Sequence, residues 1–164
     1  SKHSSLKAVV ITGMGGSATV GDLVSDLSTA TKGIVPIVSW RDYGLPAWVN
    51  HETLIIASSY SGRTRETLSA FRMALKEDLP VMALTGGGTL EALAIEHNVP
   101  VIYCNQVGGN DELIFDGDSF ACWPDGSLRV QAAAFVEDLV QVDVDAPPQP
   151  VAGRNLLEPV HGVA

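Results

Sequence analysis

Residues 54–64 read Leu-Ile-Ile-Ala-Ser-Ser-Tyr-Ser-Gly-Arg-Thr, an apolar run followed by a cluster of hydroxyl side chains around one glycine. The apolar run predicts a buried strand, and the residues that follow Thr64 predict a helix. At such a junction the first N–H groups of the helix are unpaired and the helix dipole is positive, so an anion can bind. Two interpretations of these residues stay open: a phosphate pocket, or an ordinary helix start that is capped by Ser61 or Thr64.

The order of strand, loop and helix recurs throughout the first hundred residues. Near-continuous apolar strands, each separated from the next by a crossover, indicate a parallel sheet with helices on both faces. A helix after the second strand is doubtful because Tyr43-Gly44-Leu45-Pro46 interrupts that connection. The strands are expected at 7–12, 34–38, 53–57, 81–84 and 99–103, and the helices over about 17–30, over about 64–76 and after 85–89.

The sequence after Tyr103 has a different pattern, which is typical of short strands joined by tight turns. Asp116-Gly117 and Pro124-Asp125-Gly126 are strong hairpin signals. We expect one composite domain over residues 1–164, with an α/β part at 6–103 and a β-hairpin part at 104–145. Within the second part, strands are expected at 113–115, 119–123, 128–130 and 136–144, before a Pro/Gly-rich tail at 146–164.

Composition and charge exclude several classes of partner. The 164 residues are 46% hydrophobic, enough for one full core, and no apolar stretch approaches the roughly 20 residues that span a bilayer. The formal net charge of −9 argues against nucleic acid and acidic membrane surfaces, which attract clustered Lys and Arg. Cys104 and Cys122 lack metal-site spacing and lie in apolar runs, so we interpret them as small buried residues with reduced thiols. The prediction is a soluble cytoplasmic protein without a metal.

Three loops rich in glycine or hydroxyl residues, at 13–17, 59–64 and 85–89, each follow a predicted strand. In a parallel sheet all three lie at the carboxyl edge, where ligands bind near the topological switch point. The first loop lacks the third spaced glycine of a dinucleotide site, no acidic residue ends the second strand, and the sequence has no P-loop. We therefore expect a small-anion site and no nucleotide cofactor.

These loops resemble those of a sugar isomerase (SIS) domain, in particular the amino-terminal domain of bifunctional phosphoglucose/phosphomannose isomerases. The resemblance covers about residues 6–103 and rests on Gly-Met-Gly-Gly-Ser-Ala at 13–18, Ser-Ser-Tyr-Ser-Gly-x-Thr at 58–64 and Ala-Leu-Thr-x-Gly-Gly at 83–88. It implies a flavodoxin-like sheet in the order 2-1-3-4-5 and a sugar phosphate as ligand. Arg63 stands where the family usually has Asn, and its guanidinium could tighten phosphate binding or face solvent. The implied phosphate-binding residues, with Arg63 added, are Gly15, Gly16, Ser17, Ser59, Ser61, Arg63 and Thr64.

A second resemblance begins where the first ends. The segment Asn-Gln-Val-Gly-Gly-Asn-Asp-Glu at 105–112, its continuation to Phe120 and the turn at 124–126 are similar to the nitrilase-type glutaminase domain of glutamine-dependent NAD synthetase. This resemblance covers about residues 99–145. That family uses a Glu-Lys-Cys triad that lies before the matched segment, so neither Cys104 nor Cys122 takes the place of the nucleophile.

The two patterns meet at residues 99–105, a strand that either family could supply. The simplest account is a recombined or engineered chimera. The alternative is a natural protein whose two halves only look like these families.

No catalytic residue is assigned from the sequence. The catalytic Glu and His of the isomerase family, and its Arg beyond the fifth strand, lie outside the matched segment. His97 is interpreted as a residue at a helix end, and His51 and His161 as solvated. The leading hypothesis is a sugar-phosphate-binding fold without catalysis. The alternatives are an active aldose–ketose isomerase that acts on glucose or mannose 6-phosphate as a dimer, and a structural chimera without a ligand. Uncovered strand edges also predict a homo-oligomer.

Overall fold

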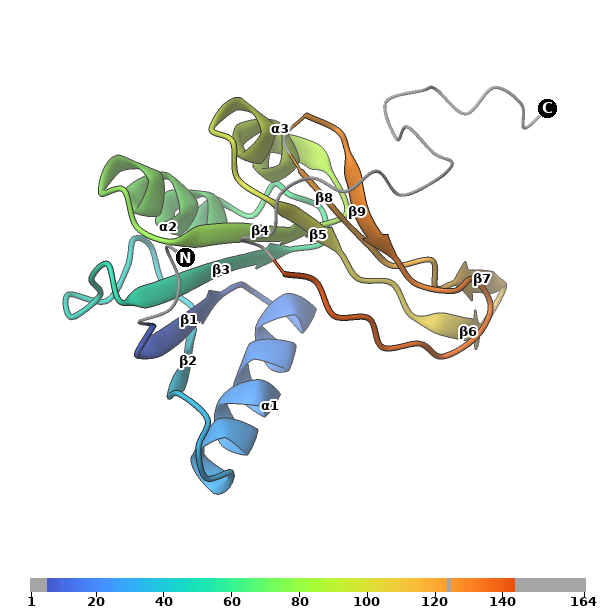
Figure 1. Cartoon of the computed structure of the whole chain (residues 1–164), viewed down its shortest axis with the longest axis horizontal. Helices are drawn as coiled ribbons and strands as arrows, with labels where there is room; N and C mark the ends of the chain where they lie inside the picture. Colours follow the sequence, from blue (N-terminus) through green and yellow to red (C-terminus); the bar gives the residue numbers. More distant parts are fainter. Residues whose placement is uncertain (1–5, 124, 144–164) are drawn as a thin grey trace.

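A seven-stranded sheet forms the centre of the computed structural model, which describes residues 6–123 and 125–143 (Figure 1). In spatial order its strands are β2 (Ile37–Trp40), β1 (Ala8–Thr12), β3 (Thr53–Ser59), β4 (Val81–Thr85), β5 (Val101–Tyr103), β8 (Phe120–Cys122) and β9 (Leu128–Gln131). The first five strands pair in parallel, and the last two extend the sheet with antiparallel pairing. The predicted order 2-1-3-4-5 and its antiparallel extension are confirmed.

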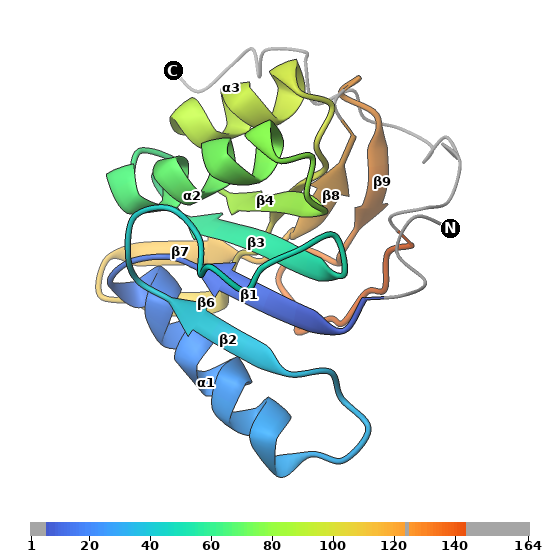
Figure 2. The same cartoon turned by 90° about the vertical axis from the view of Figure 1, so that its left-hand side faces the viewer.

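Three helices cover the two faces of the parallel part. α1 (Gly16–Ala30) packs on β1 and β2 from one side, whereas α2 (Arg65–Lys76) and α3 (Gly88–Glu96) pack on the other side (Figure 2). Right-handed crossovers require this arrangement, because the chain moves outward from β1 to β2 and then returns past β1 to β3.

Most of the core lies between the sheet and the α2/α3 layer. Phe71 and Leu90 are fully buried there, against Ala57 and Ala83 of the strands. Small strand residues leave the space that these large side chains fill, as close packing demands.

The connection from β2 to β3 contains no helix, as the Tyr-Gly-Leu-Pro sequence led us to suspect. Trp40 donates its ring N–H to the carbonyl oxygen of Gly44 at 3.0 Å, and the N–H of Gly44 donates to Ser69 Oγ of α2 at 3.2 Å. These bonds hold the loop against α2. β2 also begins at Ile37 rather than at residue 34, because Ile34 and Val35 are exposed before the strand enters the sheet.

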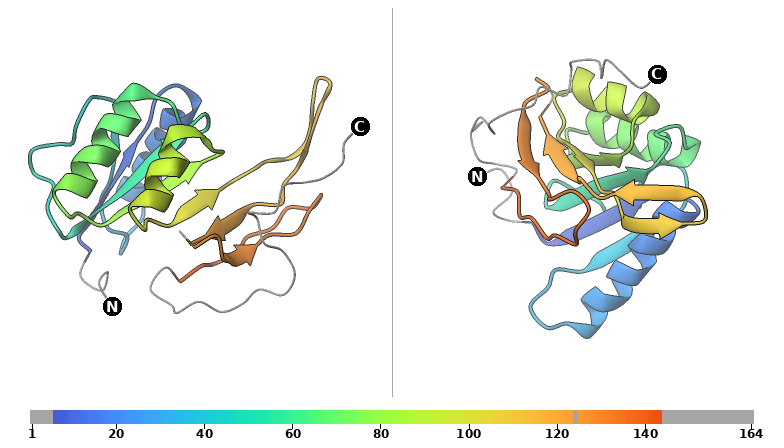
Figure 3. Two further views of the ribbon diagram at one scale, coloured as in Figure 1. Left: turned by 90° about the horizontal axis from the view of Figure 1, so that it is seen from above. Right: turned by 90° about the vertical axis from the view of Figure 1, so that its right-hand side faces the viewer.

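The second half of the chain extends the sheet by pairing β8 with the free edge of β5. Val101 pairs with Cys122 and Tyr103 with Phe120, so β8 lies directly beside the last parallel strand. Between them, β6 (Val107–Asn110) and β7 (Leu113–Asp116) form a separate two-stranded hairpin that projects away from the sheet (Figure 3). The glycine-rich β6 was not predicted, since two of its four residues are Gly and its alternation is weak.

The prediction of a strand at 136–144 is wrong for the residues that the structure describes. Residues 136–143 are irregular, and the nearest pairing is an isolated bridge between Gly117 and Ala134. Phe135 adopts a left-handed conformation with φ of 63°, which interrupts an extended chain, and Leu139 is 95% exposed because no second sheet packs on it. Residue 144 and the predicted tail at 146–164 lie outside the described residues.

Among the described helices, none has both the length and the apolar character that crossing a membrane would need.

Candidate functional site

A pocket of about 470 Å³ lies at the carboxyl edge of the parallel sheet, on the side of α1. It opens between the ends of β1 and β3, the switch point of this strand order, where ligands of doubly wound folds bind. The lining residues come from the three predicted loops, from α1 and from the segment that follows β5. They are Gly16, Ser17, Val20, Ser58, Tyr60, Leu84, Thr85, Gly86, Tyr103, Cys104 and Gln106.

The amino terminus of α1 forms one wall of this pocket. Gly15 starts the helix with φ of 55° and ψ of −132°, a conformation that suits glycine, and no side chain caps the first turn. The first turn also has no acidic residue. Gly16 and Ser17 therefore present the positive end of the helix dipole and unpaired N–H groups to the pocket.

Ser58 adds a hydroxyl group to the same wall. Side chains alternate along β3, so Ser58 faces the α1 side while Ala57 and Ser59 face α2. Ser58 is 6% exposed, and within residues 6–123 and 125–143 its hydroxyl makes no hydrogen bond to another residue. A hydroxyl that borders a pocket and makes no hydrogen bond within the protein is suited to bind a ligand oxygen.

The four predicted residues of the 59–64 loop lie at the start of α2 and do not line this pocket. The buried hydroxyl of Ser59 lies 2.9 Å from Thr64 Oγ1, while Ser61 Oγ accepts the N–H of Arg63 at 3.4 Å. Ser61 and Arg63 are exposed. No side chain caps α2, because Thr64, the residue before the helix, directs its hydroxyl toward Ser59. The structure thus differs from the simple capping interpretation, while phosphate binding by these residues stays a prediction.

The third loop packs against the second. The N–H of Gly86 donates to the carbonyl oxygen of Tyr60 at 3.1 Å, and the N–H of Leu90 donates to that of Gly62 at 2.9 Å. Thr85 Oγ1 donates to the carbonyl oxygen of Gly87 at 2.9 Å. Because its first turn already binds the second loop, α3 supports the site rather than offering a further anion position.

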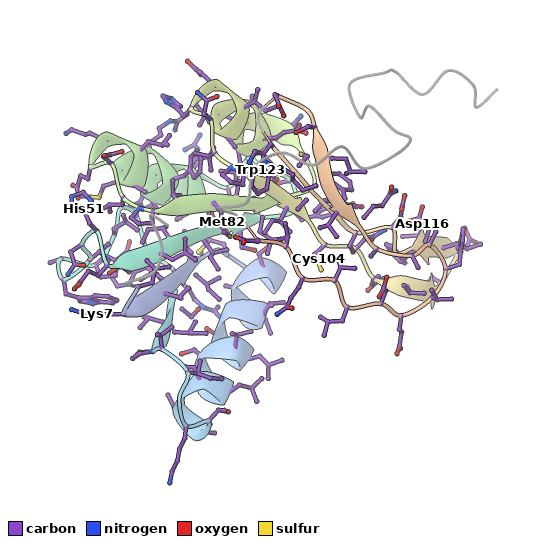
Figure 4. All side chains as sticks on the ribbon, in the orientation of Figure 1. Lys7, His51, Met82, Cys104, Asp116 and Trp123 are labelled. Carbon is purple, nitrogen blue, oxygen red and sulfur yellow. The ribbon has the colours of Figure 1, made fainter. Side chains whose placement is uncertain are left out.

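The segment after β5 supplies the remaining wall of the pocket, through Tyr103, Cys104 and Gln106. Cys104 is exposed, so its interpretation as a buried residue is wrong; β5 ends at Tyr103 and the chain then leaves the core. Figure 4 places Cys104 between the sheet and the β6–β7 hairpin that carries Asp116. Burial, followed by the nearby Tyr60, Asp116 and Cys104, raises the pKa of Tyr103.

A second pocket, of about 530 Å³, lies at the opposite edge of the sheet, where β4 and β5 begin. Its lining includes His51, Asp78 and His97, and none of the three loops contributes to it. Figure 4 shows His51 at this far end. In the described part of the chain, no group of three or more His, Cys, Asp or Glu side chains could hold a metal ion.

Sequence reasoning found the loops, Tyr60 among their residues, but missed several other lining residues, namely Val20, Ser58, Leu84, Tyr103, Cys104 and Gln106. Strict alternation along the predicted strand could have identified Ser58, because it must face away from Ser59. The residues after Tyr103 had no such signal, since their place at the pocket depends on β8 pairing with β5.

Known proteins match the two halves of the chain separately. The bifunctional phosphoglucose/phosphomannose isomerase of Caldicellulosiruptor bescii is 45% identical over 101 residues, which cover 62% of this chain and 30% of that enzyme. The glutamine-dependent NAD(+) synthetase of Synechocystis sp. is 48% identical over 59 residues, which cover 36% of this chain and 11% of that enzyme. The chain resembles two protein families, one in each half. The carbon-nitrogen hydrolase family model also matches residues 87–148.

Solved structures give the same two groups of neighbours. Tagatose-6-phosphate ketose/aldose isomerase from Escherichia coli aligns with 57% of this chain and 28% of its own, at 22% identity and a TM-score of 0.42. The glutamine-dependent NAD+ synthetase from Acinetobacter baumannii aligns with 52% of this chain and 18% of its own, at 28% identity and a TM-score of 0.35. The first part of the chain is similar in sequence to the phosphosugar isomerases. The chain spans less than a third of the length of either curated relative named above.

Proposed function

We propose that the pocket at the carboxyl edge binds a sugar phosphate and that the chain does not isomerise it. The observation that supports this most directly is the uncapped start of α1, which lines the same pocket as Ser58, a residue whose hydroxyl makes no hydrogen bond among the described residues. Gly15, Gly16 and Ser17 would receive phosphate oxygens through backbone N–H groups. Ser59, Ser61, Arg63 and Thr64 lie outside the pocket lining. Their hydroxyl and guanidinium groups would add donors only to a ligand that extends from the pocket to the start of α2.

The absence of catalysis is inferred from the lining of the pocket. Aldose–ketose isomerisation needs a base at the second carbon and an acid or cation for the developing charge. Among the described residues, the pocket lining contains no His, Asp, Glu, Lys or Arg. A bound sugar phosphate would therefore lie beside hydroxyl, amide, aromatic and apolar groups and the thiol of Cys104, without a carboxylate, imidazole or amine to act as the base.

Thermal unfolding with glucose 6-phosphate or fructose 6-phosphate tests binding. Ligand at 100 times its dissociation constant adds about 2.7 kcal/mol to the free energy of unfolding. We expect Ser17→Ala/Ser58→Ala and Ser61→Ala/Thr64→Ala each to reduce the ligand-induced shift. No shift at millimolar ligand, or an unchanged shift in both double variants, would contradict the proposal.

A coupled assay with the same sugar phosphates tests the absence of catalysis. We expect no turnover above the rate without protein. Turnover that disappears in Ser17→Ala/Ser58→Ala would instead support the alternative of an active isomerase.

We further propose that the chain is a chimera whose two parts share β5. The isomerase-like part contributes the parallel strands, and the hydrolase-like part contributes β8, which pairs along the whole of β5. Amplification of genomic DNA across codons 80–125 tests this origin. One continuous product with this sequence supports recombination in nature, and its absence supports an artificial junction.

A further inference from the structure

The pocket has an aromatic wall whose two tyrosines come from the isomerase-like part, and the second half of the chain supports one of them. Tyr60 comes from the loop after β3, and Tyr103 is the last residue of β5, where the isomerase-like part ends. Both residues line the pocket, together with Gly16 and Ser17 at the start of α1. Tyr60 is 75% exposed, so its ring is free to approach a bound molecule.

Each of the two tyrosines is held by a contact with another element: Tyr103 with β8 and Tyr60 with the loop after β4. The ring of Tyr103 lies 5.1 Å from that of Phe120, at an interplanar angle of 34°, and these two residues pair across β5 and β8. The backbone of Tyr60 is fixed by the N–H of Gly86, which donates to its carbonyl oxygen at 3.1 Å. The hydrolase-like strand thus positions one tyrosine and the third loop fixes the backbone of the other.

The chemistry of the wall favours a ligand with a flat apolar face. The lining combines the apolar side chains of Val20 and Leu84 with hydrogen-bonding groups at Gly16, Ser17 and Ser58. A cyclic sugar has such a face in its ring C–H groups, and aromatic side chains stack on it while their hydroxyls bond its edge. An open-chain polyol has no rigid face, and ordering its rotatable bonds opposes binding.

We propose that Tyr60 and Tyr103 form a stacking wall for the ring of a cyclic hexose phosphate, and that the second half of the chain holds Tyr103 in place through Phe120. This inference rests on the proposed function, because the phosphate must first bind at the start of α1. The two tyrosines then select the ring form of the ligand.

Isothermal titration calorimetry with three probes tests the wall. The probes are inorganic phosphate, 1,5-anhydroglucitol 6-phosphate, which is locked as a ring, and sorbitol 6-phosphate, which cannot close. We expect the ring-locked probe to bind at least tenfold more tightly than the open-chain probe. Equal affinities for these two would overturn the stacking wall and leave the proposed function standing. Failure of all three probes to bind would contradict the proposed function and the wall together.

Variants separate stacking from phosphate binding. Tyr60→Ala should lower the affinity for the ring-locked probe by about 3- to 10-fold, which is within the range of an aromatic contact. The affinity for inorganic phosphate should stay unchanged. Tyr103→Phe keeps the ring and should keep most of the affinity, whereas Tyr103→Leu should lose it. Tyr43→Ala is the matched control, because Tyr43 is 56% exposed and lies outside the pocket lining. An unchanged affinity in Tyr60→Ala would overturn the proposal, and because Tyr60 is exposed this variant is expected to fold.

Discussion

Gly62 joins the second loop to the third at a distance that no side chain tolerates. It has φ of 62°, and a Cβ placed on it would lie 1.8 Å from the carbonyl oxygen of Gly87. We predict that Gly62→Ala lowers the free energy of unfolding by roughly 2–4 kcal/mol, because strain at positive φ adds to a backbone clash. Urea unfolding measures the change.

Gly33→Ala is the control for this prediction. Gly33 also has positive φ, 85°, but a Cβ there would meet nothing within 4 Å. We expect Gly33→Ala to lower the free energy of unfolding by about 1 kcal/mol, which is the cost of positive φ alone. Equal losses in the two variants would contradict the close approach of the two loops.

Cys122 makes stability depend on pH in the alkaline range. Burial, and then the charges of Glu91 and Asp125, raises the pKa of its thiol from 9.0 to about 11. The folded chain therefore holds the proton more firmly than the unfolded chain. The stabilisation is complete below pH 9 and is lost as the pH rises from 9 toward 11.

Chemical unfolding at a series of pH values between 8 and about 11 tests this dependence. We expect Cys122→Ala to flatten the decline in stability over that range. Cys104→Ser, at an exposed thiol, should leave the slope as it is. A slope that is the same in Cys122→Ala would show that other groups cause the decline.

Single residues also differ in how well their positions could be predicted from the sequence. The loop glycines and hydroxyls were predicted from their place after apolar strands, because backbone chemistry at a strand–helix junction is local. Burial of Cys104 was predicted wrongly, since an apolar neighbourhood in sequence does not tell where a strand ends. Ser58 lines the pocket and Ser59 does not, a difference that follows from one step of strand alternation.

At the scale of elements, α2 depends on one aromatic side chain. Phe71 is fully buried in the core between α2, the sheet and α3. We predict that Phe71→Ala lowers the free energy of unfolding by about 3–5 kcal/mol, through lost burial and the cavity that remains. Met73→Ala, two residues along the same helix at a 38% exposed position, should change it by less than about 1 kcal/mol. Thermal or urea unfolding of the two variants side by side measures the difference.

The parallel elements were predictable and the antiparallel ones were predictable in part. Apolar strands that alternate with helices predicted a parallel sheet with helices on both faces, and the resemblance implied the order 2-1-3-4-5. The hairpin signals located β7, β8 and β9, but pairing partners depend on which edge is free. β5 offered that edge to β8, whereas residues 136–143 found none and stay irregular.

At the scale of the whole molecule, α1 presents its larger side chains to the outside. The residues that it buries against the sheet, Ala18, Gly21 and Ser28, are small, and a Cβ on Gly21 would lie 3.3 Å from Ile11 Cγ2. The helix therefore lies close to the sheet, and its large apolar residues occupy the outer face. Val20, Leu23 and Leu27 are 57%, 61% and 56% exposed at a spacing of three and four residues.

This stripe fits the predicted homo-oligomer, with a second copy of the chain as the partner. An apolar face at helical spacing is suited to pack against the same face of another α1, in a symmetric pair of helices. We predict that the protein sediments as a dimer and that Leu23→Glu raises the dimer dissociation constant at least tenfold, because two carboxylates would be placed in an apolar contact. Ile95→Glu, at a 43% exposed position of α3 on the other face of the sheet, is the control and should leave the dimer intact. Analytical ultracentrifugation of the three proteins gives the answer: a monomeric parent chain would contradict self-association, and dissociation in Ile95→Glu alone would move the contact to the α3 side.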